Sequence, residues 1–238
     1  MRAKLMKISQ NTYQNTPIWS AGQRKLGIME VVTSASISRP QSVVNRPNAV
    51  AVGTIVWLAS EVMFFAGLFA IYFSLRSMAP EIWAVQTEKL SIPFSTLNTT
   101  ILVLSSVTCQ MGVFAAERLQ PRRTGWAPSK WGVVEWFWLT YAMGAFFVVG
   151  QVYEYAVLTS EWVMLNSDAY GSAFYLTTGF HGLHVTVGLI AFLLMIGRIQ
   201  ALNVFTHRDA MSMVAVSYYW HFVDAVWIGL FLVIYVLK

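Results

Sequence analysis

The sequence predicts an all-α membrane protein, a polytopic bundle of five transmembrane helices with its N-terminus in the cytoplasm and its C-terminus outside. Hydrophobic residues make up 56% of the 238 residues, charged residues only 11%, and the mean hydropathy is +0.54. Soluble domains carry roughly 25% charged residues. Five apolar stretches each reach the roughly 20 residues that a helix needs to cross the bilayer. They are continuous rather than alternating, which disfavours a membrane β-barrel.

The basic residues fall on alternate connections between these stretches. Thirteen of the sixteen Lys and Arg lie in the N-terminal tail, the second connection and the fourth connection. The positive-inside rule therefore places these three segments of a multi-pass membrane protein in the cytoplasm. The net charge of +5 reflects this topology, so no nucleic-acid partner is expected. The predicted spans within a membrane domain over 46–238 are residues 49–75, 95–118, 133–158, 170–198 and 214–236.

Residues 1–45 precede the first span and are rich in Ser, Gln and Asn. They contain no apolar run long enough for a signal-peptide core. We interpret them as a disordered cytoplasmic tail, with a transit peptide as the alternative. Pro47 suits the first turn of a helix and Asn48 can cap one, so the first span is expected to begin there.

Glu61 stands near the middle of the first span, without a basic residue within a helical turn. It is either a residue of a proton relay or lipid-facing cleft, or a neutral carboxyl that bonds a neighbouring helix. At about 1.5 Å per residue, Glu61 and Asp224 lie near the bilayer midplane. The same arithmetic places His184 and His221 roughly 10 Å from the cytoplasmic side.

The second and third spans carry milder polarity. The second has a Ser- and Thr-rich face that is expected to pack on other helices, with channel lining as the alternative. Its Cys109 is the single cysteine and is interpreted as a small buried hydrophobe. In the third span, Glu135 and Glu154 fall near the two ends and are expected to be solvated at the interfaces. The polar residues of the second span are Asn98, Thr99, Thr100, Ser105, Ser106 and Thr108.

Histidines mark the fourth and fifth spans. His181 and His184 are three residues apart and share one helical face, and His221 precedes Asp224 by the same spacing. Three imidazoles could ligate a haem or a metal. The alternative is that each donates a hydrogen bond to a neighbouring helix, and we favour it because no acidic or Cys partner is spaced to complete a site. His221 and Asp224 are expected to pair directly with each other.

Four segments closely resemble subunit III of the haem-copper cytochrome c oxidases in order and spacing. The resemblance covers residues 46–238 and indicates the five-helix bacterial form, because the first two helices of the longer, seven-helix members are lacking. An acidic residue that those members carry shortly before the Trp-His-Phe motif is also lacking, with Val214 near its place. The four segments are Ser60-Glu61, Gly171-Ser172, Gly179-Phe180-His181-Gly182-Leu183-His184-Val185 and Tyr219-Trp220-His221-Phe222-Val223-Asp224.

The resemblance implies a non-catalytic subunit of an aa3-type, proton-pumping cytochrome c oxidase, in a bacterial plasma membrane. Such a subunit packs on subunit I beside subunit II, binds phospholipid and supports proton uptake, and it can join a larger respiratory supercomplex. Haem a and copper belong to the partner subunits, which agrees with the four His and one Cys of this chain. The resemblance also implies that Glu61 is the buried carboxyl of a lipid cleft and that Arg198 holds a lipid phosphate. Arginine suits that task as a bidentate donor at headgroup level.

Two other functions share parts of this pattern. A subunit III of a quinol oxidase or of a nitric oxide reductase-type complex would carry similar motifs. A stand-alone membrane transporter is the more distant alternative, because the sequence shows neither internal repeats nor discontinuous helices.

Overall fold

The computed structural model describes residues 49–201 and 204–237, and the predicted N-terminal tail lies outside these ranges. All regular structure in the described ranges is helical. Five helices are long and apolar enough to cross a membrane, which confirms the predicted all-α class and the number of spans. The elements are α2 (Ala49–Met78), α3 (Pro80–Thr87), α4 (Ile92–Glu117), η2 (Pro128–Lys130), α5 (Val133–Ser160), α6 (Ala169–Ala201), α7 (His207–Phe231) and the π turn η3 (Leu232–Val236).

Helix α7 begins at His207, seven residues before the predicted start of the fifth span. The Asp209 carboxylate caps it by accepting a hydrogen bond from the Thr206 backbone N–H at 3.1 Å, a polar start that an apolar pattern does not reveal. With this start, and with α6 running to Ala201, His184 and His221 both lie near the middle of their helices. Counted from the helix ends, the two histidines therefore lie farther along their helices than the predicted spans implied.

The connection between α2 and α4 contains a short helix, α3, that was not predicted. Pro80 occupies its first turn, where a missing N–H costs nothing. Trp83 is 2% exposed, donates from Nε1 to the Tyr72 hydroxyl at 3.0 Å and meets the ring of Tyr170 edge-on at 5.3 Å. The Trp83 indole therefore packs the connection against α2 and α6.

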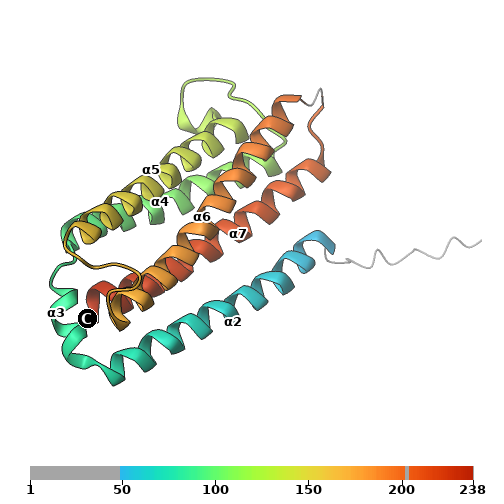
Figure 1. Ribbon diagram of the computed structural model, residues 1–238. Coiled ribbons are helices and arrows are strands. Elements are labelled where there is room, and N and C mark those ends of the chain that lie inside the picture. Colours follow the sequence, from blue (N-terminus) through green and yellow to red (C-terminus); the bar gives the residue numbers. More distant parts are fainter. Residues whose placement is uncertain (1–48, 202–203, 238) are drawn as a thin grey trace, which may run out of the picture. The chain divides into compact units, whose positions relative to one another are not determined.

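Four of the long helices form a packed group, and α2 is added on one side of it (Figure 1). Helix α4 packs on α5 and α7, while α6 packs on α5 and α7. Helix α2 packs on α6 and α7. Helix α7 thus contacts three neighbours, and no helix among residues 49–201 and 204–237 packs on its outward side between α2 and α4.

Trp220 of α7 lies at the centre of the packed group and is fully buried. Two glycines make room for its ring: a Cβ added at Gly144 of α5 would lie 2.6 Å from the indole, and one at Gly188 of α6 would lie 2.9 Å from it. Its Nε1 donates to the Ser105 hydroxyl of α4 at 2.9 Å. A single side chain therefore joins all four helices.

The predicted polar face of α4 is buried against other helices as expected. Asn98 donates to the Phe147 carbonyl at 3.2 Å, and Trp227 donates to the Thr99 hydroxyl at 2.9 Å. Thr100 is the member of the set that stays exposed. Cys109 is fully buried, which confirms its interpretation as a small hydrophobe.

Of the two interfacial glutamates predicted in α5, one is differently placed. Glu135 caps its own helix by accepting from the Gly132 N–H at 3.1 Å. Glu154 is only 5% exposed and accepts a hydrogen bond of 2.7 Å from Ser95 of α4, so its interpretation as a solvated end residue was wrong. The hydroxyl of α4 substitutes for water, because the sequence alone does not show which helix covers that face.

Candidate functional site

Glu61 of α2 meets His184 of α6 in the middle of the bundle, although the sequence had placed them at different depths. Glu61 Oε2 lies 3.3 Å from His184 Nε2, and the two side chains are 22% and 14% exposed. His184 Nδ1 lies 2.7 Å from the Phe180 carbonyl oxygen, which can only accept, so Nδ1 carries a hydrogen. Neutral His184 then offers Nε2 as an acceptor and Glu61 must hold the proton. If the imidazole is charged instead, Glu61 is a carboxylate.

In either arrangement one proton is shared by the pair and the net charge is zero. That is the least costly state for two ionisable groups in hydrocarbon. Aromatic rings enclose the pair: Phe65 lies 5.0 Å from the His184 ring, and Phe64 lies 5.1 Å from Phe180. The contact provides the neighbouring-helix hydrogen bond that one interpretation of Glu61 requires. It also supplies a site where a proton can move between two groups.

His221 and Asp224 do not pair directly, contrary to the prediction. Ser106 of α4 lies between them, with its Oγ 3.0 Å from His221 Nδ1 and in short contact with Asp224 Oδ2. His221 Nε2 is 3.3 Å from Gln110 Oε1. The prediction failed because residues three apart on one helix diverge enough for a small side chain of a neighbouring helix to enter.

The hydroxyl of Ser106 has one hydrogen and cannot donate to both neighbours. The Gln110 amide oxygen can only accept, so His221 Nε2 carries a hydrogen. If Ser106 donates to the Asp224 carboxylate, His221 Nδ1 must donate to Ser106 and the imidazole is charged. If Ser106 donates to His221 Nδ1, the imidazole is neutral and Asp224 carries a proton. The network is therefore neutral overall, as at Glu61 and His184. Ser106 was predicted only as a member of a polar face, and Gln110 was not singled out. The spacing of polar residues on α4 could have indicated both, but not their partners.

His181 differs from the other two histidines of the spans. It is fully buried, and neither ring nitrogen has a hydrogen-bond partner in the described part of the chain. The hydrogen bond expected from it to a neighbouring helix is therefore not found. Its ring stacks instead on Trp227 at 4.7 Å and lies 6.0 Å from Phe147, so it packs as an aromatic residue.

The histidines do not converge. His184 faces α2 and His221 faces α4, on different sides of the packed group. Among residues 49–201 and 204–237, no group of three or more His, Cys, Asp or Glu side chains is arranged to hold a metal. The arrangement favours hydrogen bonding over ligation as the role of His184 and His221.

Ser106 provides a test of the network. We expect Ser106→Ala to lower the free energy of unfolding by about 1–3 kcal/mol, because it leaves polar groups of His221 and Asp224 unsatisfied without creating a large cavity. Ser60→Ala is the matched control, since the exposed Ser60 hydroxyl bonds only to its own helix, at the Trp57 carbonyl, 2.6 Å away. Denaturant unfolding of the purified chain in detergent, followed by circular dichroism, measures both. Equal losses would show that Ser106 does not join the pair.

Arg198, near the end of α6, forms an ion pair rather than standing alone. Its Nη2 and Nε lie 2.9 Å and 3.2 Å from Asp209 Oδ1, and its side chain is 52% exposed. A pocket of about 530 Å³ adjoins it, and we call this the basic pocket. Asp209 occupies two of the five guanidinium N–H groups, which leaves others for an anion. The basic pocket is lined by Val50, Arg198, His207, Arg208, Met211 and Ser212.

An apolar groove of about 210 Å³ lies one helical turn farther along the same helices. Thr54 follows Val50 by one turn on α2, and Ala215 follows Met211 by one turn on α7. Trp57 stacks on Tyr219 there at 5.4 Å. The Tyr219 hydroxyl donates to the His184 carbonyl at 2.9 Å, so the groove leads towards the Glu61 and His184 pair. The groove is lined by Thr54, Trp57, Val187, Ala191, Ala215, Val216 and Tyr219.

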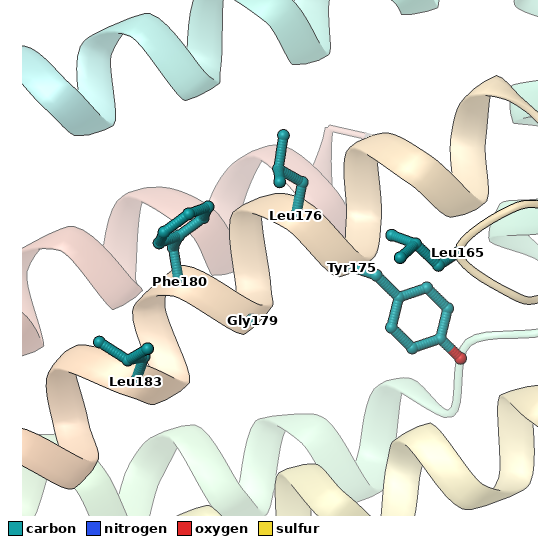
Figure 2. A pocket seen from close by; sticks show the side chains of 6 residues that line it. All are labelled: Leu165, Tyr175, Leu176, Gly179, Phe180 and Leu183. Carbon is teal, nitrogen blue, oxygen red and sulfur yellow. The ribbon is translucent and has the colours of Figure 1, made fainter.

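Another pocket, of about 390 Å³, lies over Gly179 on α6 (Figure 2). The side chains of Leu176, Phe180 and Leu183 project from one side of α6 in this view, and the Tyr175 ring projects from the other side. The Tyr175 hydroxyl is already bonded to the Val163 carbonyl at 2.9 Å. With a lining that has no charged group, this pocket suits hydrocarbon and offers nothing to a headgroup.

These features define the class of the protein. It is a polytopic helical membrane protein with neutral acid–histidine networks inside the bundle and a basic pocket at one end. The model of the family described as cytochrome c oxidase subunit III matches residues 28–238. The chain belongs to this family. That result confirms the resemblance seen in the motifs.

Relatives agree over nearly their full length. A probable cytochrome c oxidase subunit 3 of Mycobacterium tuberculosis (strain ATCC 25618 / H37Rv) is 52% identical over 205 residues, which cover 86% of this chain and 96% of the relative. Cytochrome c oxidase subunit 3 of Corynebacterium diphtheriae is 46% identical over 211 residues, covering 87% and 98%. That of Thermostichus vulcanus is 37% identical over 191 residues, covering 80% and 89%.

Proposed function

We propose that this chain is subunit III of an aa3-type cytochrome c oxidase in a bacterial plasma membrane. It packs on subunit I beside subunit II, carries no haem or copper of its own, holds phospholipid, and supports proton uptake and stability while oxygen is reduced. One observation carries this proposal. The basic pocket, the apolar groove and the Glu61–His184 pair follow one another along α2, α6 and α7. This arrangement supports a lipid site beside a pair that can hold a proton.

The shape and chemistry of this line fit a phospholipid. Arg198 and Arg208 would bind the phosphate at headgroup level, and His207 lies beside them. An acyl chain would then follow the apolar groove between α2 and α7, past Trp57 and Tyr219. A phospholipid has the same order of groups, with a charged headgroup followed by hydrocarbon chains.

Lipid analysis of the purified oxidase tests this site. We expect Arg208→Gln to lower the amount of bound phospholipid by about one molecule per chain, because it removes one cation from the basic pocket and spares the pair of Arg198 with Asp209. Arg123→Gln is the control, since Arg123 lies over the Trp126 ring at 5.3 Å in another connection. Quantitative lipid mass spectrometry gives the stoichiometry. The same lipid content in both variants would contradict the site.

The Glu61 and His184 pair supports the role in proton uptake. Two groups that share one proton can pass it from one to the other without changing the net charge of the site in hydrocarbon. The two side chains of the pair are partly exposed, at 22% for Glu61 and 14% for His184. These properties are what a proton-holding site beside a bound lipid needs.

We also propose that the N-terminus is cytoplasmic, on the distribution of basic residues. Two tryptophans provide matched test positions: Trp162, between α5 and α6, is 79% exposed, and Trp126, between α4 and α5, is 88% exposed. An impermeant thiol reagent added to intact cells should label Trp162→Cys and miss Trp126→Cys. The native Cys109 is fully buried and gives no background. Labelling of Trp126→Cys alone would show that the N-terminus lies outside.

A further inference from the structure

A polar cluster lies on the outward side of the seam between α4 and α7, where no other helix of the described part of the chain packs. Ser106, Gln110 and His221 are each half-buried, in contrast to the buried core beneath them. Around them the surface is apolar and exposed, with Val107 at 57% and Tyr218 at 39%. We call this surface the α4–α7 seam; it consists of Val103, Ser106, Val107, Gln110, Tyr218, His221, Ala225 and Ile228.

The cluster is incompletely satisfied by the chain itself. Gln110 Oε1 is occupied by His221 Nε2, but no described residue accepts a hydrogen bond from Gln110 Nε2. Beneath it, Asp224 is 4% exposed, and its Oδ1 has no partner among the described residues. An amide donor turned towards acyl chains loses the hydrogen bonds that water would have given it, which costs about 1–3 kcal/mol.

We infer that the α4–α7 seam is the surface on which a transmembrane helix of another oxidase subunit docks, and that this helix presents a hydrogen-bond acceptor to Gln110. The inference rests on the proposed place of the chain in an oxidase complex and adds which face meets the partner. Intramembrane polar residues face protein rather than lipid as a rule, and the half-buried cluster follows that rule once a helix covers it.

A helix suits this surface better than a lipid does. Acyl chains carry no acceptor at the depth of His221, which lies near the middle of α7. A helix can supply one as a Ser or Thr hydroxyl or an amide carbonyl. On the α7 side of the seam, the small side chain of Ala225 lies between the larger ones of Tyr218 and Ile228. A neighbouring backbone can therefore approach α7 closely at Ala225.

Photo-crosslinking in the assembled oxidase tests the inference. A benzophenone amino acid replaces Ala225 in one variant and Val149 in the other; Val149 is 68% exposed on α5, away from the seam. The complex is purified through a tag on another subunit, irradiated, and the crosslinked species are identified by mass spectrometry. We expect the probe at Ala225 to join a peptide of another oxidase subunit.

Crosslinks from Ala225 to lipid alone, or to a second copy of this chain, would overturn the inference while leaving the subunit's place in the complex intact. If the chain does not co-purify even with its native sequence, the proposed function itself fails. Because the probe could block docking, Ala225→Trp and Val149→Trp are compared for retention in the complex. A drop of about tenfold or more for Ala225→Trp alone supports the seam. Equal retention, together with no protein crosslink, overturns it.

Discussion

Replacing Trp220 by Ala is expected to lower the free energy of unfolding by about 3–5 kcal/mol. The indole is fully buried, and its removal opens a cavity between Gly144 and Gly188 that these residues cannot fill. It also leaves the Ser105 hydroxyl without its indole donor. Denaturant unfolding of the purified chain in detergent, followed by circular dichroism, measures the loss.

Two further variants make this test specific. Trp138 is 44% exposed and its ring contacts that of Tyr141 at 5.6 Å, so Trp138→Ala should cost less than about 1 kcal/mol. Gly144→Val should be destabilising although it removes nothing, because its Cβ would lie 2.6 Å from the Trp220 ring. Similar losses in the two tryptophan variants would show that Trp220 does not join the helices.

Removing the whole subunit from the oxidase is expected to leave the haem spectrum unchanged and the first turnovers close to normal. No redox centre is assigned to this chain, so electron transfer should continue in the partner subunits. Its loss would nevertheless expose a face of the catalytic subunit to bulk lipid or detergent. The phospholipid and shared proton proposed near Glu61 would also be lost. Spectra and oxygen consumption of the depleted and complete enzymes, recorded side by side, give both results.

Much of the fold was predictable because a bilayer restricts backbone structure so strongly. Continuous apolar stretches had to be helices, since every backbone group needs an internal partner in hydrocarbon. What the pattern could not show were polar boundaries. The start of α7 depends on the cap made by Asp209, and α3 depends on the packing of Trp83. Both features lie where apolar sequence gives way to polar sequence, and there local hydrogen bonds and packing decide where a helix begins.

The sequence predicted which residues belong to the candidate site, but it did not predict which of them contact each other. Glu61 was singled out from its position in the first span and Arg198 from the resemblance, but their partners His184 and Asp209 depend on how α2, α6 and α7 meet. The direct pair of His221 and Asp224 was wrong for the same reason, because Ser106 belongs to another helix. Helix periodicity defines faces, whereas lateral contacts between helices follow from side-chain packing that a single sequence does not reveal.

The endurance of the depleted oxidase tests the proposed supporting role most directly. Oxygen consumption is followed through many turnovers for complete enzyme, enzyme depleted of this chain, and depleted enzyme to which the purified chain has been returned. We expect the depleted enzyme to start near the normal rate and then to lose activity progressively, and the returned chain to restore a constant rate. A constant rate without the chain, or immediate loss of haem on its removal, would contradict the role proposed for it.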